Sequence, residues 1–547
     1  MHAKTILRNI KRNTNGWLVL SLIGAAVVLL PILSIFISVF QPPNENWQHI
    51  KQFLLMDYVL QSIWLVSFTG IFSVLIGVTL AWLVTAYQFP LKKFFRWALV
   101  LPLAIPPYIA AYTYSNMLSY TGIVQKTIRE QFGITPNPHW FDVMSMEGAI
   151  FIFTMFLYPY VFMITKAFLE HQSASYIENA RLLGRGSFTI FFRIVLPLSR
   201  PAIIGSLMLV IFEVLSDYGV TSYYGVQTIS TAIFSTWFGM YDVESAVRLA
   251  AWLMCGVIGL FLLERILRRN RRFNASTSKA RPLVPQRLYG VKAVLALLFC
   301  LLVLSLSFII PILQLIVWAT WSYQDVLTSD FVQMTLNTLS VALIATVLIM
   351  TCSLIVANVC RIQSNSFANL LSRLITAGYS LPGAIIAIGV LNLFIGSDHL
   401  LDRLYEQMGW GETPFMLSMT IVMIIVGYVV RFMATGYNAV EAGFDKMGTT
   451  YMNASRLLGY GITRTFFKVD LPLLKGALLS GAILTFVEII KELPLALLLR
   501  PFNFETLATK TYQYASDERI FEASIPSLFI IAVSILSVLV FHRLGEK

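Results

Sequence analysis

Apolar residues occur in blocks along the whole chain, and short polar links separate the blocks. A block of about 20 apolar residues crosses a hydrocarbon core as one helix, and a helix satisfies its own backbone hydrogen bonds in lipid. The pattern therefore predicts an all-α polytopic membrane protein with twelve transmembrane helices. The expected spans lie near 17–40, 60–86, 95–118, 148–167, 200–221 and 246–266, and then near 290–318, 337–360, 371–395, 415–437, 475–498 and 524–541.

The first block follows a basic start, as the apolar region of a signal peptide does. The block is longer than that region usually is, and no small-residue cleavage site follows it. We expect it to be retained as the first span.

Composition supports a membrane protein. Of the 547 residues, 57% are hydrophobic and only 12% are charged, whereas a soluble protein has roughly 25% charged residues. The net charge of +12 lies mostly in alternate links, which include the N-terminus, residues 92–96 and residues 265–287. By the positive-inside rule we expect both termini in the cytoplasm, and topology explains the positive charge better than nucleic acid does.

A polar stretch occurs twice in the chain. "YIENARLLGRGSFTIFFRIVLP" begins at Tyr176 and "YMNASRLLGYGITRTFFKVDLP" at Tyr451, so a constant shift of 275 residues relates them. The same shift carries Glu213 to Glu488 and Asp217 to Glu492. The chain is therefore expected to be a parallel tandem repeat of two six-helix units, with a pathway between them. The expected division is a first unit at 1–268, a basic cytoplasmic linker at 269–289 and a second unit at 290–547.

The repeated stretch resembles the EAA loop of ABC-importer permeases, which is written E-A-A-x3-G-x9-I-x-L-P. The second copy has Asn453 where the motif has Glu, and the first has Asn179 where the motif has Ala. The resemblance implies two short cytoplasmic helices that dock into the ATPase subunit, each ended by a glycine. The implied coupling residues are Glu178, Ala180, Gly184, Leu196 and Pro197 in the first copy and Asn453, Ala454, Gly459, Leu471 and Pro472 in the second. Ile177, Ala180 and Leu183 are expected on one face of the first helix.

No G-x-x-x-x-G-K-[ST] motif is present, so this chain has no P-loop for ATP. The resemblance therefore implies a separate nucleotide-binding subunit, in two copies, that uses ATP-Mg, and no cofactor bound by this chain. The chain itself is expected to be a transport subunit, and not an enzyme.

Three further stretches make the resemblance more specific within the ABC-importer permeases. They are "LPLAIPPYIAAYTYSNML", "DYGVTSYYGVQTISTAIFSTWFGMYD" and "KELPLALLLRPFNFETLATKTYQYASDERIFEAS". They are similar to fused permeases of bacterial ferric-iron importers, which implies the bacterial inner membrane and a periplasmic ferric-binding protein. Links 119–147 and 396–414 are expected to face that protein. Related permeases serve thiamine, polyamines or phosphonates, and an ion-coupled secondary transporter is the alternative from another class.

Four acidic residues fall within or beside predicted spans, where charges are costly and usually functional. Glu213 and Asp217 are spaced i, i+4, which places them on one helix face, and Glu488 and Glu492 repeat the pair. Oxygen ligands suit hard cations, so these four are candidates for a cargo pathway that binds a ferric ion transiently, with Tyr218 nearby. Alternatively Asp217 and Glu492 are simply hydrated at span ends, and Lys491 neutralises one carboxylate.

Other polar and sulfur-containing residues carry no assigned role. The six histidines form no clustered ligand set, so a zinc site is not expected. The four cysteines are expected to be packing residues, and Arg431 is left without a role.

Overall fold

The computed structural model describes residues 16–40, 42–171, 175–269, 284–363, 366–376, 378, 381–409 and 416–545. Within these ranges ten helices are long and apolar enough to cross a membrane, and the number rises to twelve if each of two bent helix pairs is one span. The sequence-based prediction of an all-α membrane protein is confirmed. The basic residues before position 16 lie outside the described residues, so their placement stays a prediction.

The first unit contains α2 (Gly16–Val39), α3 (Glu45–His49), α4 (Leu55–Ala86), α5 (Lys92–Ala98), α6 (Pro107–Leu118), α7 (Ile123–Phe132), α8 (Met146–His171), α9 (Ser175–Leu182), α10 (Ser187–Ile190), α11 (Leu196–Ser216), α12 (Gly219–Tyr223), α13 (Ile229–Met240) and α14 (Val243–Arg269). The second unit contains α15 (Val291–Leu304), α16 (Ile310–Val326), α17 (Ser329–Gln363), α18 (Ser366–Thr376), α19 (Gly383–Met408), α20 (Ile421–Met447), α21 (Thr450–Leu457), α22 (Ile462–Thr465), α23 (Leu471–Leu473), α24 (Lys475–Ile490), α25 (Pro494–Leu499), α26 (Leu507–Ser516) and α27 (Ile520–Gly545).

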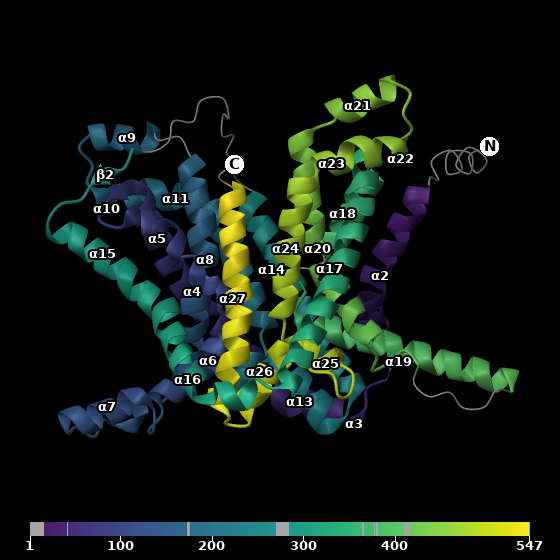
Figure 1. Cartoon of the computed structure of the whole chain (residues 1–547), viewed down its shortest axis with the longest axis horizontal. Helices are drawn as coiled ribbons and strands as arrows, with labels where there is room; N and C mark the ends of the chain where they lie inside the picture. Colours follow the sequence, from purple (N-terminus) through teal and green to yellow (C-terminus); the bar gives the residue numbers. More distant parts are fainter. Residues whose placement is uncertain are drawn as a thin grey trace.

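Two faces of the bundle are distinct. The short helices α9 and α21 lie on one face, and α3, α7, α13 and α26 lie at the opposite end of the long helices (Figure 1). The last helix, α27, runs from the second face to the first. The two copies of the repeated stretch therefore lie on one side, as a parallel repeat requires.

The third predicted span of the first unit is not one straight helix. Residues 92–104 and 107–132 bend by 90° with respect to each other. Pro106 has an extended backbone and Pro107 opens α6, and proline cannot continue the preceding helix because it lacks an N–H donor. The span predicted near 95–118 thus consists of two helical segments joined by a sharp bend.

A second bend of 72° separates residues 462–473 from α24. It follows a π-helical turn at Phe466–Asp470, and the first unit has the matching π-helical turn at Phe191–Val195. In the first unit this turn lies inside one continuous helical span, Ser187–Ser216, whereas in the second unit the chain breaks and bends before α24. The π-helical turn is therefore common to both units, but the bend belongs to the second unit.

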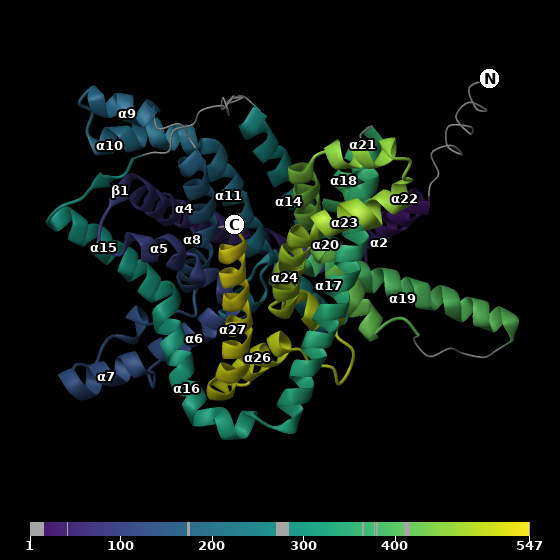
Figure 2. The ribbon, with the colours of Figure 1, turned by 45° about the horizontal axis from the view of Figure 1, so that its top comes forward.

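The first spans are exchanged between the units. α2 packs on α17 and α19 of the second unit, and Ser34 Oγ of α2 donates to the carbonyl of Gly389 in α19 at 3.0 Å. The π-helical turn between α15 and α16 packs on α8 of the first unit, where Tyr114 donates a hydrogen bond to the carbonyl of Leu306. Figure 2 shows α15 and α16 beside the first unit. Each unit therefore packs against part of the first span of the other.

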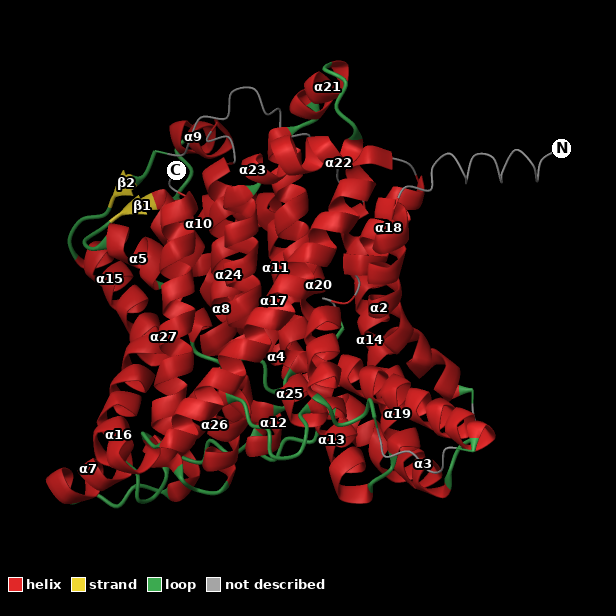
Figure 3. Ribbon diagram, turned by 45° about the vertical axis from the view of Figure 1, so that its right-hand side comes forward, coloured by secondary structure: helices red, strands yellow, loops and turns green. Residues whose placement is uncertain are grey.

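A two-residue sheet joins the units on the side of α9. β1 (Tyr87–Gln88) pairs in parallel with β2 (Gln286–Arg287), as Figure 3 shows. Residues 270–283 of the expected linker lie outside the described residues, so the linker boundaries stay a prediction.

Asp242 anchors the opposite face. Its carboxylate accepts hydrogen bonds from Asn44 at 2.8 Å and from the Ser245 hydroxyl at 2.6 Å. Burial raises the pKa of Asp242, but the hydrogen bonds from Ser245, Asn46 and Asn44 outweigh it and hold the pKa below its usual value. This network ties α3 to the start of α14.

The four cysteines are free thiols, and Cys300 is fully buried. It packs in a cluster with Val303 and Tyr158, which is the packing role expected for it.

We predict that Gly389→Ala disrupts the exchange of the first span. An added Cβ would lie 2.5 Å from the carbonyl oxygen of Pro31 in α2, so the helices must separate, at a cost of roughly 1–3 kcal/mol. The midpoint of thermal unfolding of the detergent-purified protein should fall. The matched control is Gly396→Ala on the same helix, where an added Cβ meets no described atom within 4 Å. Equal midpoints for the two variants would contradict the tight contact.

Candidate functional site

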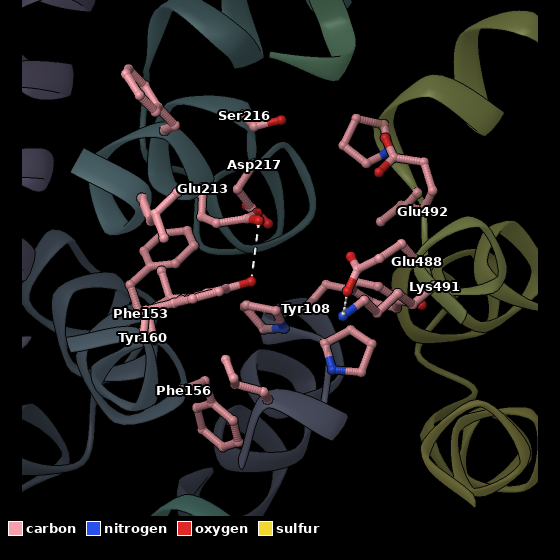
Figure 4. A pocket seen from close by; sticks show the side chains of 18 of the residues that line it. Tyr108, Phe153, Phe156, Tyr160, Glu213, Ser216, Asp217, Glu488, Lys491 and Glu492 are labelled. Atoms are coloured by element: carbon pink, nitrogen blue, oxygen red, sulfur yellow. Dashed lines mark hydrogen bonds and ion pairs between the residues drawn. The ribbon is translucent and has the colours of Figure 1, made fainter. Parts of the chain in front are cut away.

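A cavity of about 120 Å³ lies between the two units. Its lining includes all four acidic residues that the sequence singled out, namely Glu213, Asp217, Glu488 and Glu492. Glu213 and Asp217 come from the end of α11, and Glu488 and Glu492 come from the end of α24 (Figure 4). The pseudo-two-fold relation predicted from the 275-residue shift therefore brings the four carboxylates to one place.

The position of each pair follows from where its helix ends. α11 ends at Ser216, and Asp217 then accepts hydrogen bonds from the backbone N–H of Val220 at 2.8 Å and of Thr221 at 3.4 Å. Glu492 does the same in the second unit, since Oε1 accepts from the N–H of Leu495 at 3.3 Å. Acidic side chains favour the start of a helix because its N–H groups lack partners. The two carboxylates thus accept from N–H groups in the first turns of α12 and α25 while they line the cavity.

The sequence left open that Asp217 and Glu492 are simply hydrated at the ends of their spans. Glu492 is only 8% exposed, so it is not a hydrated residue at a span end. Asp217 is partly buried.

Two cations accompany the carboxylates of the second unit. Lys491 Nζ lies 2.7 Å from Glu488 Oε1, which is the neutralisation that the sequence left open. Arg431 Nε lies 3.3 Å from Glu492 Oε2. Arg431 was therefore missed by the sequence analysis, although a cation inside a predicted span is itself a signal of function.

The first unit supplies neutral partners. Tyr160 donates a hydrogen bond to Glu213 at 3.4 Å, and Tyr108 also lines the cavity. Tyr218, which was expected to contribute an oxygen, instead stacks on Phe234 with ring centroids 3.7 Å apart and does not line the cavity. The phenols near the acidic residues are Tyr108 and Tyr160.

The cavity holds four carboxylates and two cationic side chains. Within the described residues no group of three or more histidine, cysteine, aspartate or glutamate side chains is arranged to hold a metal ion. The arrangement suits a passage that attracts positive charge and has no closed ligand cage. Transient binding of a metal cargo by these four residues stays a prediction.

The repeated stretches form the short helices α9 and α21, as expected. Gly184 has φ +74° and Gly459 has φ +84°, a left-handed conformation that glycine adopts without a steric penalty. In the first copy the N–H of Gly184 donates to Arg181 O and the N–H of Arg185 donates to Ala180 O, each at 3.0 Å. These two bonds form a Schellman motif, so the predicted helix stop at both glycines is confirmed.

The faces of these helices differ in part from the expectation. Ile177 and Ala180 are buried, but Leu183 is 80% exposed because the helix ends before it. Four leucines are exposed at the ends of the two helices, namely Leu182, Leu183, Leu457 and Leu458. Exposed apolar residues at matching places mark a contact surface, and the "RLLG" repeated in both copies was the signal for it.

The other expected coupling residues lie around these helices. Glu178 is partly buried, whereas Asn453 and Ala454 are exposed. Leu196 and Pro197 open α11, and Leu471 and Pro472 open α23. The roles of these residues in coupling stay predictions.

A second, larger cavity of about 1000 Å³ lies on the face opposite α9 and α21. Its lining comes from both units and includes Trp237, Tyr241, Asn337, Phe502 and Glu505. Tyr241 is 87% exposed and Phe502 is 85% exposed. An exposed aromatic groove of this kind is typical of a protein contact surface.

The chain is similar in sequence to known transport permeases. The family model described as "Binding-protein-dependent transport system inner membrane component" matches residues 73–317 and 349–546. The Fe(3+)-transport system permease protein FbpB 2 of Haemophilus influenzae is 23% identical over 483 residues, which cover 87% of each chain. The molybdenum transport system permease protein ModB of Escherichia coli is 30% identical over 163 residues, which cover 30% of this chain and 69% of that protein. The crystal structure of a bacterial alginate ABC transporter in complex with its alginate-bound periplasmic protein matches with a TM-score of 0.39 and 16% identity, over 50% of this chain and 99% of that chain.

We predict that Gly184→Val and Gly459→Val impair coupling while the membrane fold persists. A β-branched residue in the left-handed region is strained by roughly 1–2 kcal/mol, so the Schellman motif and the exposed leucines beside it should shift. Transport driven by the ATPase subunit that the resemblance implies should fall or become uncoupled from ATP hydrolysis.

The matched controls are Gly186→Val and Gly461→Val. These glycines have φ −69° and −71°, which valine adopts readily. Normal assembly and transport in the variants at 184 and 459 would refute the docking role of α9 and α21.

Proposed function

The chain belongs to the family of binding-protein-dependent transport system inner membrane components, and from this premise we propose that it imports ferric iron as the permease of an ATP-driven transporter. The family and the ten to twelve candidate spans place it in the inner membrane as a multi-pass protein. The cargo is proposed to be handed over by a periplasmic ferric-binding protein.

The observation that carries the proposal is the meeting of four carboxylates from both units at one cavity. A hard trivalent cation favours oxygen ligands. Four acidic side chains and only two cationic ones line the cavity, which favours a cationic cargo over an anionic one. The likeness to a Fe(3+)-transport permease over 87% of the chain supports the same cargo.

ATP hydrolysis is proposed to occur on a separate subunit, because this chain lacks a P-loop motif. α9 and α21 each offer one docking helix with exposed leucines, and this supports two copies of the ATPase. ATP-Mg then belongs to that subunit, and this chain binds no cofactor of its own.

Orientation follows from the same assignment. If α9 and α21 face the ATPase, their side is cytoplasmic, and both termini are proposed to lie there as the positive-inside rule indicates. The opposite face is then periplasmic. It carries α7 within link 119–147 and the groove lined by Tyr241 and Phe502, which are proposed to contact the binding protein. Part of link 396–414, residues 410–415, lies outside the described residues.

An anionic cargo is the second candidate, and Arg431 and Lys491 in the cavity favour it. The relative with 30% identity is named as a molybdenum transport permease. Both cations are already paired with Glu492 and Glu488, whereas Glu213 and Asp217 have no cationic side chain within 4 Å among the described residues. The carboxyl groups of Glu213 and Asp217 therefore remain as oxygen ligands without a cationic partner, and we favour the cation.

We predict that the double variant Glu213→Gln and Glu488→Gln loses iron uptake. The amides keep size and polarity but remove two negative charges, and each charged contact is worth roughly 1.5–3 kcal/mol. Uptake into vesicles reconstituted with the ATPase and the binding protein should fall at least about tenfold, while assembly and basal ATP hydrolysis persist. Glu213→Gln alone should cost more than Glu488→Gln alone, because Lys491 already neutralises Glu488.

The matched control is Glu441→Gln. Glu441 is an acidic residue of α20 that accepts a hydrogen bond from Tyr437 at 3.0 Å and does not line the cavity. Uptake near the wild-type level in the double variant would refute the proposed role of the carboxylates in the cargo pathway. Increased uptake of an anion such as molybdate would favour the second candidate.

We predict that a cysteine introduced at position 130 is labelled from the periplasm. Glu130 lies on α7 with its side chain 65% exposed, and its ion pair with Lys126, at 3.9 Å, is a weak surface contact. In a chain whose native cysteines are replaced, Glu130→Cys should react with an impermeant maleimide in intact spheroplasts. Arg185→Cys, beside α9, should react only after membrane disruption, and the reverse pattern would overturn the orientation.

A further inference from the structure

Arg431 ties the two units together at the cavity. Nη2 donates to Ser216 Oγ of the first unit at 2.9 Å, and Nη1 donates to the carbonyl of Leu381 in the second unit at 2.9 Å. Nε faces Glu492 at 3.3 Å. Ser216 Oγ also accepts from the N–H of Gly383 at 3.0 Å, so the end of α11 is held to the start of α19.

The cations at this site are absent from the first unit. The constant shift of 275 residues places Arg431 where the first unit has Phe156 and Lys491 where it has Ser216. All four of these residues line the cavity, so the repeat has diverged at the site itself. The first unit offers carboxylates without cations, and the second offers carboxylates with built-in cations.

We propose that Arg431 is a tethered counter-cation that keeps the cavity closed and selects for multivalent cargo. This rests on the proposed function, in that the cavity is taken as the cargo path. In the closed state the guanidinium occupies the place of the cargo charge at Glu492. A cargo cation first meets Glu213 and Asp217 and then displaces Arg431 from Glu492.

The selection follows from Coulomb's law, in which the attraction to a carboxylate grows with the charge of the cation. A monovalent cation offers Glu492 no more charge than Arg431 already does. Arg431 also loses no translational or rotational freedom of association when it pairs with Glu492, because it is part of the chain. A trivalent ion offers three times the charge, so it can compete for the carboxylate.

Displacement also releases the tie between the units. Glu492 is 8% exposed and the Arg431 side chain is 13% exposed, and a buried charge that loses its partner is strongly destabilised. Arg431 therefore leaves only when another cation takes its place. When it leaves Glu492, the bond to Ser216 strains or breaks, and the contact between α11 and α19 weakens. Occupancy by cargo is thus linked to separation of the units.

The test uses the complete transporter, with its ATPase subunit, in vesicles of phosphatidylethanolamine and phosphatidylglycerol. Arg431→Gln keeps hydrogen-bonding groups but removes the charge. We expect cargo-independent ATP hydrolysis to rise about tenfold, since a lost charged hydrogen bond has an effect of that order. We also expect potassium ions to leak through the variant but not through the wild type. Arg431→Lys should show much less leak and less cargo-independent hydrolysis than Arg431→Gln, because lysine keeps the positive charge.

The matched control is Arg361→Gln, which breaks another buried ion pair, between Arg361 and Asp470 at 2.5 Å, away from the cavity. If Arg361→Gln leaked as much as Arg431→Gln, general destabilisation would explain the result and the proposal would be wrong. If Arg431→Gln showed no potassium leak and unchanged ATP hydrolysis, the proposal would be overturned as well.

These outcomes differ from a failure of the proposed function. Potassium leak and cargo-independent hydrolysis require no iron, so they report on Arg431 alone. If the wild type imports no iron but Arg431→Gln leaks, the iron assignment fails and the closing role of Arg431 stands. If the wild type imports iron and Arg431→Gln stays tight, only the role of Arg431 fails.

Discussion

Charges buried within an apolar layer need partners, and the contacts of Arg431 meet this need at the centre of the molecule. The guanidinium reaches Glu492, the carbonyl of Leu381 and the hydroxyl of Ser216. Each of these groups sits where a helix ends or begins, so one side chain fixes the relative positions of α11, α19 and α25. The cavity exists because these helices stop short of one another, and its charge balance is set by the same contacts.

The duplicated chain explains why the site lies between the units. A parallel repeat places equivalent positions face to face across a pseudo-two-fold axis, and both α11 and α24 end near the acidic residues. Exchange of the first spans, with α2 on the second unit and the turn between α15 and α16 on the first, binds the units firmly at their outer sides. The polar contacts of Arg431 and Ser216 at the cavity join the units near the axis.

The two units are alike at the repeated short helices and differ at the cavity. α9 and α21 both end at a glycine in the left-handed conformation, which glycine adopts without a steric penalty. At the cavity the units differ, with Phe156 and Ser216 in the first at the positions of Arg431 and Lys491 in the second. In the first unit Glu213 accepts from Tyr160 and Asp217 accepts from backbone N–H groups, whereas Glu488 and Glu492 of the second unit form ion pairs.

The sequence by itself determined the membrane class, most of the spans, the repeat, both helix stops and the four acidic residues. These depend on local hydropathy, on glycine conformation and on a constant register, all of which are readable along one chain. Only the tertiary structure decided the partner of Arg431, the stacking of Tyr218 on Phe234, the exposure of Leu183 and the exchange of the first spans. These are contacts between residues far apart in the chain, or depend on where a helix stops in space, and hydrophobic periodicity carries no information about which helix packs against which.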